Sequence, residues 1–349
     1  MSLPNDEASG EPLPAPPRSP GVWGSYVPLE DEPSTAPTEV WQDAVLADLP
    51  ELRPADVGTV RRRRRILPLL LFLATCLSTF WVGATDWMPM VALSSSGRAY
   101  LYVVSNWQQG LIYMTAVLAI LLTHEMGHFL FTVRYHIPAS FPLFIPVPIN
   151  AIGTMGAVIG MDGLKANRRQ LFDIGLAGPL AGLIVAIPIM WIGIERLDLT
   201  TSPGKIAFHN PMVVQWLIGY LRHDLAATTT VGIRQLNPFY FAGWVGLLIT
   251  GLNMLPISQL DGGHVTYALF RRRAHSLARA FLVISIVFLI VNINRAYIWT
   301  MMLILVILMG TDHPLTSDDS VSLGPVRWIL GVTSLVIPIL CFPLWGIEM

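Results

Sequence analysis

Long apolar stretches alternate with short polar or arginine-rich segments throughout the chain after residue 65. A helix needs about 20 mostly apolar residues to cross a bilayer, and several stretches approach this length. They are residues 66–84, 110–133, 171–194, 239–255, 280–293, 296–310 and 326–345. The fifth and sixth meet at a tight turn and could instead form a hairpin that does not fully cross. The pattern therefore predicts an all-α polytopic membrane protein with six to seven transmembrane helices.

Composition supports the same class. Only 13% of the 349 residues are charged, whereas 53% are hydrophobic. A soluble domain usually has about a quarter of its residues charged, so an ordinary soluble fold is excluded. The two cysteines, Cys76 and Cys341, both lie in apolar stretches. They are too few for a cysteine-rich zinc site, and we expect them to be buried apolar side chains.

The first 60 residues differ from the rest of the chain. They contain eleven prolines and eleven acidic residues, and only two basic residues, Arg18 and Arg53. Such a segment cannot bury enough apolar surface to offset the entropy lost on ordering. We expect residues 1–60 to be a disordered, proline-rich acidic tail and residues 61–349 to form the transmembrane domain.

Basic residues are concentrated on one side of the predicted topology. With a cytoplasmic N-terminus, sixteen of the 22 lysines and arginines fall on the inside, including the run of arginines at 61–65. Cytoplasmic segments of membrane proteins are enriched in these residues. The charge pattern predicts a multi-pass protein of the cell (cytoplasmic or inner) membrane with its N-terminus in the cytoplasm.

One apolar segment, residues 141–159, breaks the helical pattern. Pro142, Pro146 and Pro148 exclude a continuous helix, and the β-branched residues and glycines favour extended chain with turns. Both flanks lie on the cytoplasmic side of the predicted topology. We expect a re-entrant, β-like segment between the second and third spans. Irregular backbone at membrane depth must lie against protein or a water-filled cavity.

The second predicted span contains the sequence His124-Glu125-Met126-Gly127-His128. Two histidines four residues apart project from one face of a helix and can bind one metal ion, and the intervening Glu125 can act as general base. Ionisable groups within the membrane are costly and usually functional. The alternative interpretation is a proton relay or a polar packing cluster in a transporter.

A catalytic zinc ion needs three protein ligands and an open position. The strongest third candidate is Asp261, which follows the end of the fourth span and precedes two glycines. The second and fourth spans run in the same direction, so both motifs fall in the cytoplasmic half of the bilayer. His264 is the competing ligand, or would orient a ligand or substrate. We favour Asp261 because a pair of histidines with a carboxylate matches known zinc hydrolases.

Three further polar or small-residue features lie in or beside the spans. Asn253 could donate hydrogen bonds to an oxyanion, or equally bond two helices together. Asp173 is interpreted as a charge at a helix N-terminus. Gly175, Gly178 and Gly182 form a small-residue face suited to close helix contact.

These motifs, in this order, resemble the site-2 protease family of intramembrane zinc metalloproteases. The resemblance covers about 150 residues and includes the histidine motif, Asn253…Pro256…Leu260-Asp261-Gly262-Gly263, Gly153-Thr154-Met155-Gly156-Ala157 and Ala177-Gly178-Pro179-Leu180-Ala181-Gly182. It implies one zinc ion per chain held by His124, His128 and Asp261, with Glu125 as the base. It also implies a three-helix catalytic core formed by spans two to four, at about residues 110–265. Gly153 and Gly156 are candidate substrate-binding positions.

The segment 195–238, about 44 residues, is too short for a PDZ domain. This resembles the subgroup without such domains, which includes plastid and cyanobacterial members. His313-Pro314 followed by Thr316, Asp318 and Asp319 also resembles the C-terminal region of that subgroup.

The sequence therefore predicts an intramembrane metalloprotease that cleaves peptide bonds within or near transmembrane segments. Its expected partners are the lipid bilayer and single-span or other membrane protein substrates, with no nucleic acid. Residues 141–159 could supply an edge strand that pairs with an unwound substrate. An ion-coupled transporter and a catalytically inactive scaffold of the same fold are the alternative functions.

Overall fold

The computed structural model describes residues 66–161, 165–225, 228–257, 259–311 and 316–348. The chain divides into two units, Met1–Arg62 and Arg63–Met349, and all of the described residues lie in the second. The predicted acidic tail, the arginine run at 61–65 and the His313-Pro314 pair lie outside the described residues. Predictions about them stay predictions.

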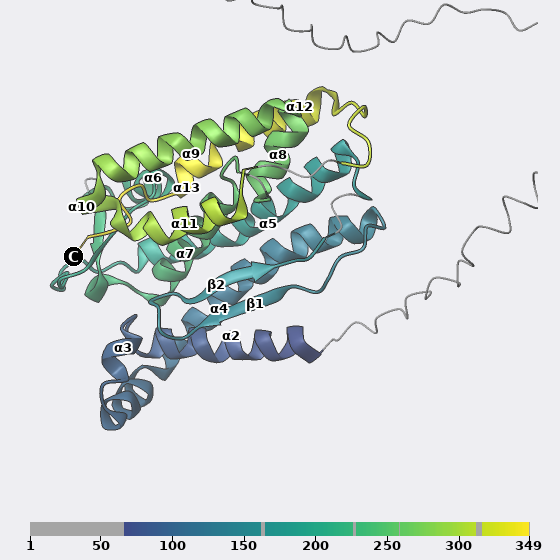
Figure 1. The fold of residues 1–349 in the computed structure, drawn as a ribbon. Helices are drawn as coiled ribbons and strands as arrows, with labels where there is room; N and C mark the ends of the chain where they lie inside the picture. Colours follow the sequence, from purple (N-terminus) through teal and green to yellow (C-terminus); the bar gives the residue numbers. More distant parts are fainter. Residues whose placement is uncertain (1–65, 162–164, 226–227, 258, 312–315, 349) are drawn as a thin grey trace, which may run out of the picture. The chain divides into compact units, whose positions relative to one another are not determined.

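The described part is mostly helical and contains two small sheets (Figure 1). The α-helices are α2 (Ile66–Ala84), α3 (Pro89–Ala92), α4 (Ser96–Arg134), α5 (Arg168–Glu195), α6 (Met212–Leu221), α7 (Pro238–Asn253), α8 (Asp261–Phe270), α9 (Arg273–Val291), α10 (Ile293–Ala296), α11 (Thr300–Met309), α12 (Gly324–Ser334) and α13 (Ile337–Cys341). Short 3₁₀ turns are η2 (His223–Leu225), η3 (Ile233–Gln235) and η4 (Tyr297–Trp299). The strands are β1 (Leu143–Val147), β2 (Gly153–Val158), β3 (Ala207–His209), β4 (Thr230–Gly232) and β5 (Ile347–Glu348).

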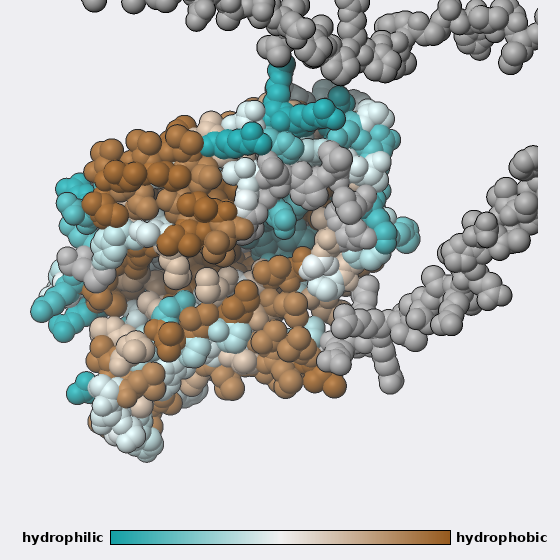
Figure 2. Space-filling model, viewed as in Figure 1, coloured by the Kyte–Doolittle hydropathy of each residue, from teal (hydrophilic) through white to brown (hydrophobic). Residues whose placement is uncertain are grey.

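Five stretches in the described part are long and apolar enough to cross a membrane: α2, α4, α5, α9 and the α12–α13 stretch Gly324–Cys341. Apolar side chains such as Ile284 and Ile290 of α9 are 65% and 69% exposed, and Figure 2 shows a continuous apolar surface over α9 and α11. A bilayer accounts for such a surface, since soluble monomers rarely expose large apolar patches. The polytopic membrane class is therefore confirmed. Helix α7 has 16 residues and α11 has 10, so crossing by the fourth and sixth predicted spans stays a prediction.

Helix α4 begins at Ser96, well before the predicted start near residue 110. Its 39 residues correspond to about 58 Å of helix at 1.5 Å per residue. The backbone leaves the helical region at Asn106, where φ is −121° and ψ is 20°. The N-terminal part was not predicted because it contains Arg98, Gln108 and Gln109 and so lacks an unbroken apolar pattern.

The predicted three-helix core corresponds to α4, α5 and α7, each of which contacts the other two. Glycines allow these close approaches: a Cβ atom on Gly127 would lie 2.6 Å from the carbonyl oxygen of Ala177, and one on Gly243 would lie 2.8 Å from Cα of Met190. Small residues let membrane helices approach closely enough for tight van der Waals packing. The small-residue face predicted for α5 is confirmed, because Gly175, Gly178 and Gly182 contact α8 and α4.

Strands β1 and β2 form an antiparallel hairpin between α4 and α5, with an irregularity between Phe144 and Pro146. This confirms the extended conformation predicted for the proline-containing segment. The Ser78 hydroxyl of α2 donates a hydrogen bond to the Gly153 carbonyl oxygen at 2.5 Å. The Tyr113 hydroxyl of α4 donates to the Ile152 carbonyl oxygen at 2.7 Å. These bonds anchor the hairpin to both helices.

A second sheet, with strand order β4-β3-β5, was not predicted. It joins the segment between α5 and α7 to the C-terminal end of the described chain, through pairs such as Phe208 with Val231 and Phe208 with Ile347. The strands have only two or three residues each. Such short strands cannot display the alternation of polar and apolar residues by which a strand is recognised.

Candidate metal centre

Helices α4 and α8 bring together three side chains that could hold a metal ion: His124, His128 and Asp261. The Nε2 atoms of His124 and His128 are 3.2 Å apart. Oδ2 of Asp261 lies 3.2 Å from Nε2 of His124 and 3.3 Å from Nε2 of His128. The three donor atoms therefore form a nearly equilateral triangle.

This triangle fits the donor set of a tetrahedral zinc ion. Zinc binds imidazole nitrogen at about 2.0–2.1 Å and carboxylate oxygen at a similar distance, so two ligands of a tetrahedral ion lie roughly 3.3 Å apart. The observed edges of 3.2–3.3 Å match that separation. Three protein donors leave one position for water or substrate, as in catalytic zinc sites.

The orientation of His128 is set by the backbone of α5. Its Nδ1–H donates a hydrogen bond to the Ile174 carbonyl oxygen at 2.8 Å, which leaves Nε2 free to bind a metal.

Two glycines of α5 make room for the imidazole rings. A Cβ atom on Gly178 would overlap the His128 ring, and one on Gly182 would lie 3.1 Å from Nδ1 of His124. The close approach of α5 to α4 therefore places both rings beside the helix backbone.

Asp261 is the first residue of α8, directly after the segment that follows α7. Gly262 has no room for a side chain, because a Cβ atom there would overlap the Met254 carbonyl and lie 2.6 Å from that of Leu255. The glycine after Asp261 thus allows α8 to begin against the end of α7. This brings the carboxylate to the histidines although 137 residues separate it from His124.

Three other predicted site residues are Glu125, Asn253 and His264. Glu125 is 5% exposed and lies within α4 beside His124. Nδ2 of Asn253, the last residue of α7, is 3.3 Å from Nε2 of His124. His264 lies one turn into α8 against Gly175, and the described metal-binding group does not include it.

The two predicted substrate-binding glycines lie in β2. Gly153 contacts Thr79 of α2, whereas a Cβ atom on Gly156 would meet no atom within 4 Å. Both have positive φ values, 85° and 91°, which side chains other than glycine rarely adopt.

The sequence model of peptidase family M50 matches residues 112–292. The match covers more than half of the chain and includes all of the candidate ligands and Glu125. The chain belongs to peptidase family M50. This is the site-2 protease family that its motifs resemble.

Several curated relatives of this M50 chain are named as probable zinc metalloproteases of the chloroplast. This chain is 34% identical over 165 residues to the probable zinc metalloprotease EGY1, chloroplastic, of Oryza sativa subsp. japonica. The match covers 45% of this chain and 28% of the relative. The Arabidopsis thaliana protein of the same name is 34% identical and is covered to 29%. The probable zinc metalloprotease EGY2, chloroplastic, of Oryza sativa subsp. indica is 30% identical over 209 residues, covering 57% of this chain and 36% of the relative. The chain therefore matches only about a third of these relatives' length.

The role of Gly178 in seating His128 can be tested by Gly178→Ala. The added methyl group must displace the His128 ring, so we expect metal affinity to fall at least about tenfold. The measurement is zinc retained by purified protein during dialysis against a graded chelator series. Gly219→Ala in α6 is the matched control, because a Cβ atom there would meet nothing within 4 Å. A folded Gly178→Ala protein with unchanged zinc affinity would contradict this role.

Proposed function

We propose that this chain is an intramembrane zinc metalloprotease that hydrolyses peptide bonds within or near transmembrane segments of membrane protein substrates. The observation that carries the proposal is the triangle of His124, His128 and Asp261, two of which lie on α4, a helix long and apolar enough to cross a membrane. Burying such groups among apolar helices is costly unless they act together. Membership of a peptidase family and the names of the relatives support hydrolysis over transport.

The chain's own residues can divide the chemistry between them. A zinc ion held by the triangle supplies Lewis acidity toward a carbonyl oxygen and toward water. The Glu125 carboxylate takes a proton from the attacking water and passes it to the leaving amine. The Asn253 amide, 3.3 Å from Nε2 of His124, is placed to donate a hydrogen bond to the oxygen on which negative charge develops.

We also propose that the N-terminus lies on the cytoplasmic side of the membrane and the active site in the cytoplasmic half of the bilayer. The distribution of lysines and arginines supports this orientation. The histidine motif lies towards the C-terminal end of α4, which finishes at Arg134. A site near that end is accessible to water from the side that carries most of the positive charge.

The β1–β2 hairpin is proposed to hold the unwound substrate. A helical substrate hides its carbonyls in its own hydrogen bonds and must become extended before hydrolysis. A two-stranded sheet has free edges to which an extended peptide can add. The open space beside Gly156 and the exposure of Met155 (52%) leave room along β2.

The proposed base is tested by Glu125→Gln, which keeps the size of the side chain but removes its basicity. We expect cleavage of a single-span substrate in detergent or proteoliposomes to fall by at least about a hundredfold, while zinc remains near one per chain. Retained cleavage in this variant would exclude Glu125 as the base. A wild-type protein that neither binds zinc nor cleaves would favour transport or an inactive scaffold.

The proposed role of the hairpin is tested by Gly156→Ala. An alanine at φ 91° is strained, so the local strand shape should change although space is available. We expect a raised KM for the substrate with unchanged zinc content. Gly310→Ala is the matched control, since Gly310 has φ 78° and equally open surroundings outside the hairpin. Equal KM values for the two variants would count against substrate pairing at β2.

A further inference from the structure

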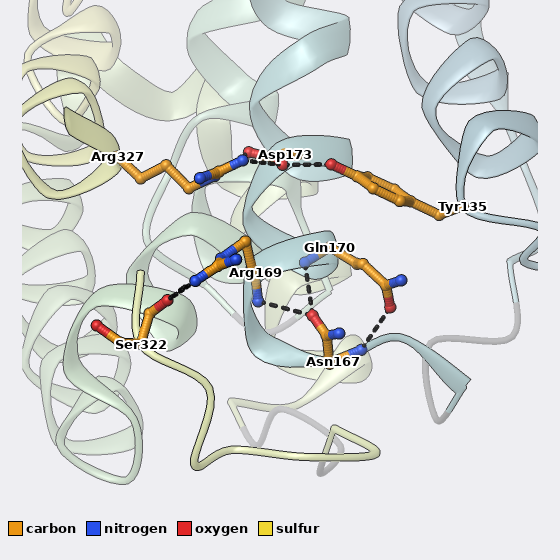
Figure 3. Close-up of polar contacts among 7 residues, drawn as sticks. All are labelled: Tyr135, Asn167, Arg169, Gln170, Asp173, Ser322 and Arg327. Carbon is orange, nitrogen blue, oxygen red and sulfur yellow. Dashed lines mark hydrogen bonds and ion pairs between the residues drawn. The ribbon is translucent and has the colours of Figure 1, made fainter. Parts of the chain in front are cut away.

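The start of α5 carries a polar cluster that the proposed chemistry does not use. The Asp173 carboxylate lies between side chains from two other parts of the chain (Figure 3). Nε and Nη2 of Arg327, from α12, donate to its two oxygens at 2.8 and 3.0 Å. The hydroxyl of Tyr135, immediately after α4, donates to Oδ2 at 2.5 Å. Asp173 therefore does more than supply a charge at a helix N-terminus.

This cluster is adjacent to the group that orients His128. The residue after Asp173 is Ile174, whose carbonyl oxygen accepts the His128 Nδ1–H bond. Tyr135 lies two helical turns beyond His128 along the same part of the chain. Two hydrogen bonds therefore join this part of the chain to the first turns of α5. One is donated by the His128 imidazole to the Ile174 carbonyl oxygen, and the other by the Tyr135 hydroxyl to Asp173. A rotation of this part of α5 would move the acceptor away from the ring.

The same part of α5 also holds the helix that begins at Asp261. Arg168 is only 8% exposed. Its Nε donates to the Ala268 carbonyl oxygen at 2.6 Å and its Nη2 to that of Leu269 at 3.2 Å. These carbonyls are in the last turn of α8, where backbone acceptors lack helical partners and a cation is favourable. Because α8 has ten residues, fixing its end restricts the position of Asp261 at its start.

We propose that Asp173 and Arg168 are positioning residues for the metal centre. Asp173 holds α5 so that the Ile174 carbonyl orients His128, and Arg168 holds α8 so that Asp261 meets both histidines. The inference rests on the proposed function, in which these three side chains bind a metal ion. Burial supports it: the Asp173 side chain is 12% exposed, and a carboxylate so enclosed is kept only with bonded partners.

Cobalt(II) bound to the purified full-length protein tests the inference, because its visible absorption reports ligand geometry without depending on catalysis. The variants are Asp173→Asn and Arg168→Gln. We expect an altered cobalt spectrum and an affinity for cobalt that falls about 10- to 100-fold, as for other groups that orient metal ligands. Arg169→Gln is the matched control: Arg169 lies on the same turn, is exposed, and bonds the Ser322 carbonyl oxygen instead (Figure 3). Its spectrum should equal that of the wild type.

A milder variant covers the case in which a substitution disturbs folding. Tyr135→Phe removes one hydrogen bond from Asp173 and leaves its ion pair with Arg327 intact, and circular dichroism establishes that each variant is folded. We expect the spectrum of Tyr135→Phe to change in the same direction as that of Asp173→Asn, by a smaller amount. Folded variants with the wild-type spectrum and affinity would overturn the inference while leaving the proposed function standing. Wild-type protein that binds no cobalt would overturn the metal site and the inference together.

Discussion

The enclosure of two imidazoles and a carboxylate among the helices is the constraint on which the rest of the structure depends: the side chains of His124, His128 and Asp261 are 3%, 12% and 15% exposed. Nε2 of His124, Nε2 of His128 and Oδ2 of Asp261 lie within 3.3 Å of one another. Removing one partner from a buried charged group costs about 3–5 kcal/mol, so the three side chains must be satisfied together. A single metal ion with these three protein ligands would do so and would leave one position open for chemistry.

Glycines in the surrounding helices allow these three side chains to lie close together. Gly178 and Gly182 let the backbone of α5 lie directly beside the imidazole rings, and Gly262 lets α8 begin against the end of α7. Their lack of side chains is therefore a requirement of the site as much as of helix packing. Hydrogen bonds from the Ser78 and Tyr113 side chains then fix the β1–β2 hairpin to the same bundle. One scaffold thus supports both the metal-binding side chains and the strand edge proposed for substrate.

Much of this organisation could be predicted from local sequence patterns. The four-residue spacing places His124 and His128 on one helix face, and the prolines of residues 141–159 exclude a helix where the hairpin lies. Asp261 could be inferred because few other acids follow an apolar span. The contribution of the Ile174 carbonyl could not, since every residue has a backbone carbonyl and none is distinguished by sequence. The partners of Asp173 were missed because the Arg327 contact joins residues 154 apart.

The most direct test of the account is the zinc content of purified wild-type protein and of Asp261→Ala, measured by elemental mass spectrometry after removal of loosely bound metal. The account predicts about one zinc per chain in the wild type and far less than one in the variant, because two histidines alone do not complete a zinc site. Zinc content unchanged by Asp261→Ala would contradict the assignment of Asp261, and wild-type protein without zinc would contradict the metal centre.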